Sequence, residues 1–112
     1  MATATYLQRG EALDYVNSGD AVIEAGTVVV FGTKIGVAAA DIAAGATGAV
    51  HVEGVFELPE KSGESAIAQG AAVYWNATAA AITATATNNT LAGYAAAGAG
   101  ASAEKILVKI NA

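Results

Sequence analysis

The sequence predicts an all-β fold, a small β-barrel or β-sandwich, built on short strands that follow glycines. Runs rich in β-branched and aromatic residues follow Gly26, Gly48 and Gly70, and the chain closes on a similar run at residues 106–110. Short runs of this kind, separated by glycine turns, are typical of sandwiches and barrels. The 112 residues are enough for one core only, so we expect a single β domain over residues 1–112.

A four-residue unit, Ile-x-x-Gly, recurs along the chain. It occurs at residues 23–26, 42–45 and 67–70. Glycine adopts a positive φ angle at no steric cost. Each unit therefore predicts an apolar anchor followed by a tight turn, after which a strand begins.

Two parts of the sequence resemble each other at an offset of 44 residues. Residues 19–26 match residues 63–70, and the same offset places Val29 on Val73 and Phe31 on Trp75. We therefore predict two structurally related halves. Chance similarity in a chain rich in Ala and Gly is the alternative.

Residues 81–87 read Ala-Ile-Thr-Ala-Thr-Ala-Thr, an alternation typical of a strand with one Thr-lined face. Asn88-Asn89 would supply a turn, because Asn tolerates positive φ, and residues 91–97 would return as a second strand. This pattern predicts a Thr-rich hairpin. Residues 57–63, which include the only proline, are expected to be a surface loop that divides the two halves.

The apolar content comes mainly from alanine. Thirty residues are Ala, whereas Val, Ile, Leu and Phe together number 25. Alanine removes little apolar area from water, so the core should be thin and its margin over chain entropy small. A chain of this kind often gains stability from a partner or a symmetric oligomer, which favours a role in an assembly.

The charge balance argues against nucleic acid and membrane surfaces as partners. Five basic and ten acidic residues give a formal net charge of −5, without a basic stripe. The absence of cysteine excludes disulfides and thiolate metal sites. Because the sequence shows no apolar signal segment and no run of about 18 apolar residues, we expect a cytoplasmic protein.

The sequence predicts no catalytic, cofactor or metal site, and so no enzyme and no small-molecule substrate. His51 has no partners at the spacing that catalysis or metal binding needs. Four glutamates between residues 53 and 64 lack the pattern of a calcium loop and are expected to form a solvated rim. Lys61-Ser62 lacks the preceding glycine of a phosphate-binding loop. No serine has a histidine and an acid in a recognisable motif.

The aromatic pair on one expected strand, Tyr74 and Trp75, holds two of the largest side chains. We expect them to anchor the core, with one of the two as a candidate for a subunit interface.

Almost end to end, the chain resembles the small head-decoration, or capsid cement, proteins of tailed bacteriophages. The resemblance rests on residues 19–30, 36–38, 41–48, 53–59 and 70–75, and on the closing run to Ile110. Its most specific parts are Gly-Val-Phe-Glu-Leu-Pro at residues 54–59 and Val-Tyr-Trp at residues 73–75. These motifs are structural and name no active site.

The resemblance implies a compact β-barrel or sandwich that binds the major capsid protein on the outside of an expanded capsid, often as a homotrimer at local three-fold positions. It implies a virion protein on the capsid exterior, made in the cytoplasm of a bacterial host. Some members are labelled recombinases, a label that the missing phosphate-binding loop does not support here.

Residues 1–10 are predicted to form an extended N-terminal arm. The segment has few features of a core strand but carries Tyr6 and Leu7, followed by Gln8 and Arg9. We expect these four residues to contact a shell subunit or a neighbouring copy by strand addition. A disordered tail is the alternative.

Two further readings remain beside the cement protein. A small β binding module of a phage tail or fibre would show the same thin core. A carrier domain of the biotinyl-lipoyl type would need an exposed lysine between small or Met residues at a hairpin tip. Lys61 instead lies between Glu60 and Ser62, which disfavours the carrier.

Overall fold

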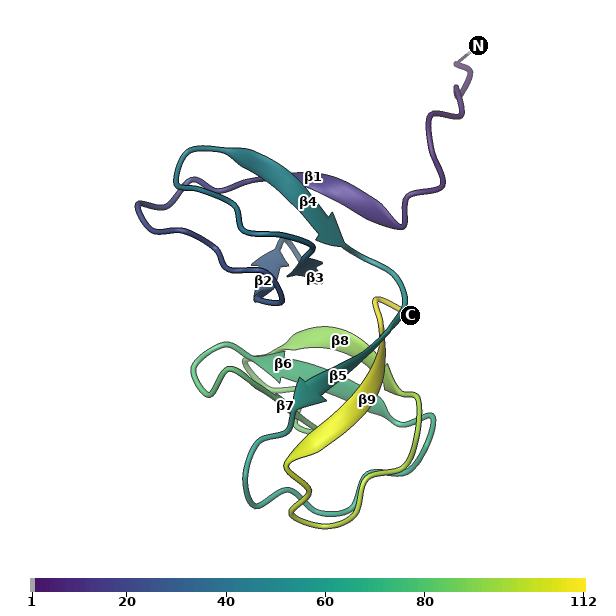
Figure 1. The fold of residues 1–112 in the computed structure, drawn as a ribbon. Coiled ribbons are helices and arrows are strands. Elements are labelled where there is room, and N and C mark those ends of the chain that lie inside the picture. The colour runs from purple at the N-terminus through teal and green to yellow at the C-terminus, as the bar shows by residue number, and fades with distance from the viewer. Residues whose placement is uncertain (1) are drawn as a thin grey trace.

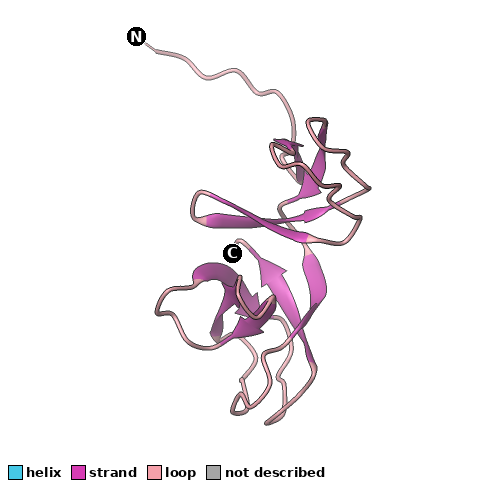
Figure 2. Ribbon diagram, turned by 90° about the vertical axis from the view of Figure 1, so that its left-hand side faces the viewer, coloured by secondary structure: helices cyan, strands magenta, loops and turns pink. Residues whose placement is uncertain are grey.

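The computed structural model describes residues 2–112, which form nine β-strands and no helix (Figures 1 and 2). The all-β prediction is therefore confirmed, and this part of the chain contains no helix that could span a membrane. The strands are β1 (Ala12–Val16), β2 (Val28–Phe31), β3 (Lys34–Ala38), β4 (Thr47–His51), β5 (Val55–Pro59), β6 (Ala72–Asn76), β7 (Ala81–Thr83), β8 (Thr90–Ala95) and β9 (Lys105–Ile110).

The strands form two antiparallel sheets, one above the other in Figure 1. The first sheet has the order β1-β4-β3-β2 and the second has the order β5-β9-β8-β6-β7. With β7 set aside, the two orders are the same. Asn17, just after β1, and Glu60, just after β5, also donate corresponding backbone hydrogen bonds, to Ala46 O and to Glu104 O. That the chain consists of two structurally related halves stays a prediction.

The second sheet curls until its two edge strands meet. A parallel bridge joins Glu60 to Ile82, and the backbone N–H of Lys61 donates to Ile82 O at 2.8 Å. This contact lies at the ends of β5 and β7 and draws the sheet toward a barrel. The first sheet stays open, with β1 and β2 as its edges.

The three Ile-x-x-Gly units form the predicted turns. Gly26, Gly45 and Gly70 have φ angles of 86°, 77° and 88°. In each unit the residue after the glycine donates its N–H to the carbonyl three residues before it, as in Thr27 N to Glu24 O at 3.1 Å. A positive φ at the third position of such a turn defines type II, which favours glycine there.

The predicted Thr-rich hairpin is wrong in its pairing. β7 pairs with β6, and β8 pairs with β6 on its other side. The strand stops at Thr83 because the next two backbone N–H groups bond to side chains: Ala84 N donates to the Glu64 carboxylate at 2.7 Å and Thr85 N donates to Thr83 Oγ1 at 3.2 Å. These bonds take residues 84–89 out of the sheet.

The predicted surface loop at residues 57–63 is also wrong in its first half. Residues 55–59 form β5, and Leu58 is buried in the core. Pro59 is tolerated because it ends an edge strand, where no further ladder hydrogen bond is required of it. The chain passes between the two sheets earlier, at residues 52–54.

The apolar core consists of two clusters that share β3. One cluster lies between the sheets and includes Ile35 and Val37, together with Trp75 and Ile82 from the second sheet. The other lies on the opposite side of the first sheet and includes Ala38 and Val50. Ile35 through Ala38 are all buried, so both faces of β3 are covered.

Asn111, just after β9, joins the C-terminal end of the chain to β3. Its side-chain amide donates to Ile35 O at 2.7 Å, and its carbonyl oxygen accepts from Ile35 N at 3.2 Å. The same amide also donates to Val52 O at 2.9 Å, and the Asn111 backbone N–H donates to Ala92 O. This cluster of bonds, the Asn111 clasp, ties the two sheets together. Asn suits the position because its φ is 57°.

We expect Asn111→Ala to lower the free energy of unfolding by about 1–3 kcal/mol, because three part-buried backbone groups lose their partner. Urea denaturation followed by tryptophan fluorescence measures this change. Asn88→Ala is the matched control, since Asn88 is exposed and has a φ of 61°. Equal losses of unfolding free energy in the two variants would contradict a role for the side-chain bonds of Asn111, because both variants place alanine at a positive φ.

Candidate interaction surface

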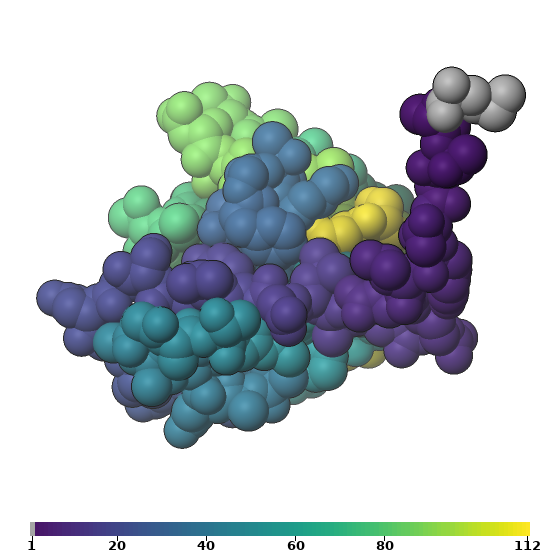
Figure 3. Space-filling model, turned by 90° about the horizontal axis from the view of Figure 1, so that it is seen from above, coloured from purple at the N-terminus to yellow at the C-terminus, as the bar shows by residue number. Residues whose placement is uncertain are grey.

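The N-terminal segment stands away from both sheets as an arm (Figure 3). Residues 2–9 are exposed and belong to no strand. Tyr6 is 75% exposed and Leu7 is 87% exposed. The side chains of Gln8 and Arg9 reach only nearby residues, Ala12 O at 3.5 Å and the Glu11 carboxylate at 3.5 Å. The arm therefore presents two large apolar side chains to solvent.

The structure separates the aromatic pair on β6. Trp75 is 7% exposed and belongs to the core, whereas Tyr74 is partly exposed. Successive side chains of a strand point to opposite faces of the sheet, so only one member of such a pair reaches the surface. Of the two interface candidates, Tyr74 is the one that an external partner can contact.

The outer face of the second sheet carries an apolar surface that the sequence analysis missed. Pairing places Val55 and Tyr94 on either side of Lys109, and Tyr74 beside Leu91, all on the face opposite the core. The exposed apolar side chains of this outer face are Val55, Leu91, Tyr94 and Leu107. In β9 Leu107 is exposed between buried Ile106 and Val108. All three residues are apolar, so the sequence gives no signal that Leu107 faces outward.

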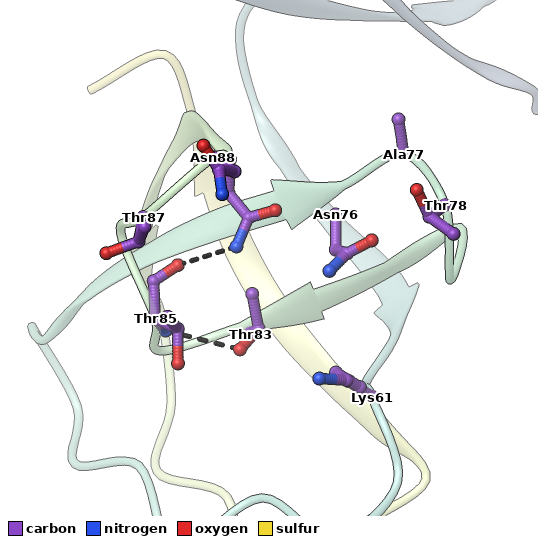
Figure 4. A pocket seen from close by; sticks show the side chains of 9 residues that line it. Lys61, Asn76, Ala77, Thr78, Thr83, Thr85, Thr87 and Asn88 are labelled. Carbon is purple, nitrogen blue, oxygen red and sulfur yellow. Dashed lines mark hydrogen bonds between the residues drawn. The ribbon is translucent and has the colours of Figure 1, made fainter.

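Two hollows lie near the loop at residues 84–89. The first has a volume of about 310 Å³ and a polar lining, with the side chains drawn in Figure 4: Lys61, Asn76, Ala77, Thr78, Thr83, Thr85, Thr87, Asn88 and Asn89. The second has a volume of about 360 Å³ and is more apolar: Gly32, Thr33, Lys34, Tyr74, Asn89, Thr90 and Leu91. Asn89 borders both.

Neither hollow holds a recognisable catalytic set. Their linings contain hydroxyls, amides and two lysines, without a histidine or a carboxylate. Within residues 2–112 no group of three or more His, Cys, Asp or Glu side chains is placed to hold a metal ion. His51 packs against the Phe56 ring, with the ring centroids 5.8 Å apart.

The expectation that the glutamates near residue 60 form a solvated rim is wrong for Glu60. This residue is 6% exposed, and neither carboxylate oxygen has a hydrogen-bond partner within residues 2–112. It follows Phe56 and Leu58 at alternate positions and so points inward with them. Burial raises the pKa of Glu60 above its ordinary value of 4.5, and the nearby Glu64 carboxylate raises it further.

Glu64, by contrast, has a defined structural role. Its carboxylate accepts from Thr83 Oγ1 at 2.9 Å and from Ala84 N at 2.7 Å. These bonds hold the end of β7 beside the barrel contact formed by Glu60 and Ile82. The two glutamates therefore differ: one carboxylate organises a strand end, and the other is buried without a partner.

Comparison with known proteins adds one match. A family model described as phage cement protein matches residues 7–110. No curated protein and no solved structure was found to match the chain. The family match covers both sheets and begins inside the arm.

The raised pKa of Glu60 predicts a pH dependence of stability. The folded chain keeps the Glu60 proton to a higher pH than the unfolded chain does. The contribution of this proton to the free energy of unfolding is therefore complete below pH 4.5 and is lost as the pH rises through the pKa of the folded chain. Glu60→Met should remove this dependence and raise the free energy of unfolding at pH 8 by about 1–3 kcal/mol. Denaturation between pH 4 and pH 8 measures both effects.

Glu24→Met, at an exposed position, is the control for the loss of one negative charge. It should leave the pH dependence of the parent chain unchanged. Equal slopes in the Glu60 and Glu24 variants would contradict the assignment of the dependence to the buried carboxylate.

Proposed function

Because the chain belongs to the phage cement protein family, we propose that it binds the outer surface of the expanded capsid and stabilises it as a head-decoration protein. The family match over residues 7–110 is the observation that carries this proposal. A cement protein is a structural, capsid-binding component of the virion. Beyond this family role, we propose that the chain recognises the expanded state of the capsid and that its binding stabilises that state.

The exposed surface supports a protein partner. Four exposed apolar side chains share the outer face of the second sheet with Lys109 and Glu57, and two more stand on the arm. Exposed apolar surface bordered by polar residues is typical of protein interaction sites. The partner that the family role implies is the major capsid protein.

Stabilisation follows from the mass-action effect of selective binding. Capsid expansion opens gaps and strained joints between shell subunits. A protein that binds only the expanded shell shifts the equilibrium toward it, by an amount that grows with its concentration relative to Kd. Many copies on one shell add their effects, so each contact can be weak.

We assign the capsid and subunit contacts to Tyr6, Leu7, Gln8 and Arg9 of the arm and to Tyr74 on β6. The arm is extended and exposed, a state from which it can add a strand to a sheet edge of a partner. Trp75 lies behind Tyr74 in the core and supports that strand from within. On the capsid we propose a homotrimer, located on the virion exterior.

Co-sedimentation with expanded and unexpanded capsids of the parent phage tests the proposal. We expect saturable binding to the expanded form alone, with a fixed number of copies per shell subunit. Equal binding to both forms would contradict selectivity for the expanded state. Binding to neither would contradict the decoration role and favour a tail or fibre module.

Deletion of residues 2–9 should weaken capsid binding at least tenfold while leaving the free energy of unfolding unchanged, because the arm packs on neither sheet. Substitution of Tyr6 and Leu7 by Ser tests the apolar side chains at constant length. Substitution of Thr3 and Thr5 by Ser is the matched control and should bind as the parent does. Undiminished binding after the deletion would rule out the arm as a contact.

A further inference from the structure

The free edge of β2 offers unpaired backbone groups. The N–H of Ala38 donates to Thr27 O, so residues 27 and 38 form a hydrogen-bonded pair of the β2–β3 ladder. Bonded and non-bonded pairs alternate along an antiparallel ladder. The backbone N–H and C=O groups of Val28 and Val30 therefore point away from β3. Within residues 2–112 no other strand pairs with this edge.

This edge lacks the devices that protect the other edge strands. Natural edges carry charges or proline, or they are covered. β1 carries Asp14, and β5 carries Glu57 and ends at Pro59. β7 is short, and its end meets the region after β5. β2 reads Val-Val-Val-Phe, with Val30 exposed at its centre.

The more apolar of the two hollows lies at the end of this edge. Gly32, Thr33 and Lys34, which directly follow β2, form one side of it, and Tyr74 and Leu91 contribute to the other. An unpaired edge beside a side-chain pocket is the arrangement by which sheets recognise extended peptides. The main-chain hydrogen bonds hold such a peptide, and the pocket selects one of its side chains.

We propose that β2 receives the N-terminal arm of a second copy of this chain as an added strand, with Tyr6 in the hollow beside Gly32, Thr33 and Lys34. The arm is extended and has no charged side chain from Ala2 to Gln8, as a strand laid on an uncharged edge requires. At about 3.3 Å per residue, the eight arm residues 2–9 span about 26 Å, which is longer than the four-residue strand β2.

The position of the arm argues for a second copy as the donor. The arm enters β1, and β4 and β3 separate β1 from β2 in the sheet order. In Figure 1 the arm extends from the start of β1, away from β2. Donor and acceptor at opposite edges of one sheet make a head-to-tail contact, and such contacts close into a ring when the rotation between copies allows it.

This inference rests on the proposed function in one respect only: the two copies are expected to meet when both are bound to the capsid. The chain contains no cysteine, so single cysteines can report the contact. Thr5→Cys, which leaves Tyr6 in place, and Thr33→Cys variants are purified separately, mixed on expanded capsids and oxidised. Linked peptides are then identified by mass spectrometry. Glu53→Cys replaces Thr33→Cys in the control mixture, because residue 53 is exposed and lies in the connection between the sheets.

We expect a disulfide between residues 5 and 33, and at most one tenth as much between residues 5 and 53. A link between two separately purified variants can only join different copies. Val30→Pro, which removes an outward N–H of β2 without breaking the β2–β3 ladder, should reduce the 5–33 link at least tenfold. Asp14→Pro on the opposite edge of the same sheet is the matched control and should leave the link intact.

The same samples report capsid binding separately, by co-sedimentation. Bound protein without a 5–33 link would overturn the arm–β2 contact and leave the proposed function standing. A third variant carries both Thr5→Cys and Thr33→Cys. A link that forms in this variant but not in the mixture would show that the arm covers its own β2, which also overturns the proposal. Loss of capsid binding in Val30→Pro, without any link in the parent, would assign the edge to the shell protein instead.

Discussion

The hydrogen bonds of Asn111 with the backbone of Ile35 determine where the two sheets meet, and much of the fold depends on that contact. β3 has no free face: Ile35 and Val37 pack toward the second sheet, while Ala38 packs into the cluster on the other side. Apart from Trp75, the core consists mainly of small and branched aliphatic side chains, so apolar burial alone is a weak means of orienting the sheets. The directional bonds of one amide, which reach Ile35 and Val52, provide that orientation.

Local features of the fold could be predicted from the sequence, whereas the pairing of strands could not. The Ile-x-x-Gly turns were predictable because a type II turn requires a particular φ at one residue, and Gly26, Gly45 and Gly70 supply it. The Thr-rich hairpin failed because Glu64, about 20 residues away, takes the backbone N–H of Ala84. A long-range bond of this kind leaves no periodic signal. The sequence predicts a loop over residues 57–59 of β5, because Pro59 and two glutamates obscure the alternation of Phe56 and Leu58.

The candidate contact residues were partly predictable, because some of their exposure depends on local sequence and some on long-range packing. Exposure of Tyr6 and Leu7 follows from their place outside any β pattern. For Tyr74 and Trp75 the sequence identifies an alternating pair without saying which member faces the core, since that depends on which side the first sheet covers. The burial of Glu60 depends on the meeting of β5 with β7, a contact set by the curl of the whole sheet. Its carboxylate has no partner in the described chain, so it contributes to the pH dependence of stability.

These features describe a small β protein that presents three candidate contact surfaces on its outside: an arm and an edge strand that have no strand partner within residues 2–112, and an outer face with exposed apolar side chains. The family to which it belongs places such a chain on a phage capsid. Electron cryomicroscopy of expanded capsids saturated with the protein tests the account most directly. It predicts density for both sheets on the outer surface, in contact with the shell, and arm density continuous with the β2 edge of a neighbouring copy. Density on the inner surface, or no ordered density on saturated capsids, would contradict it.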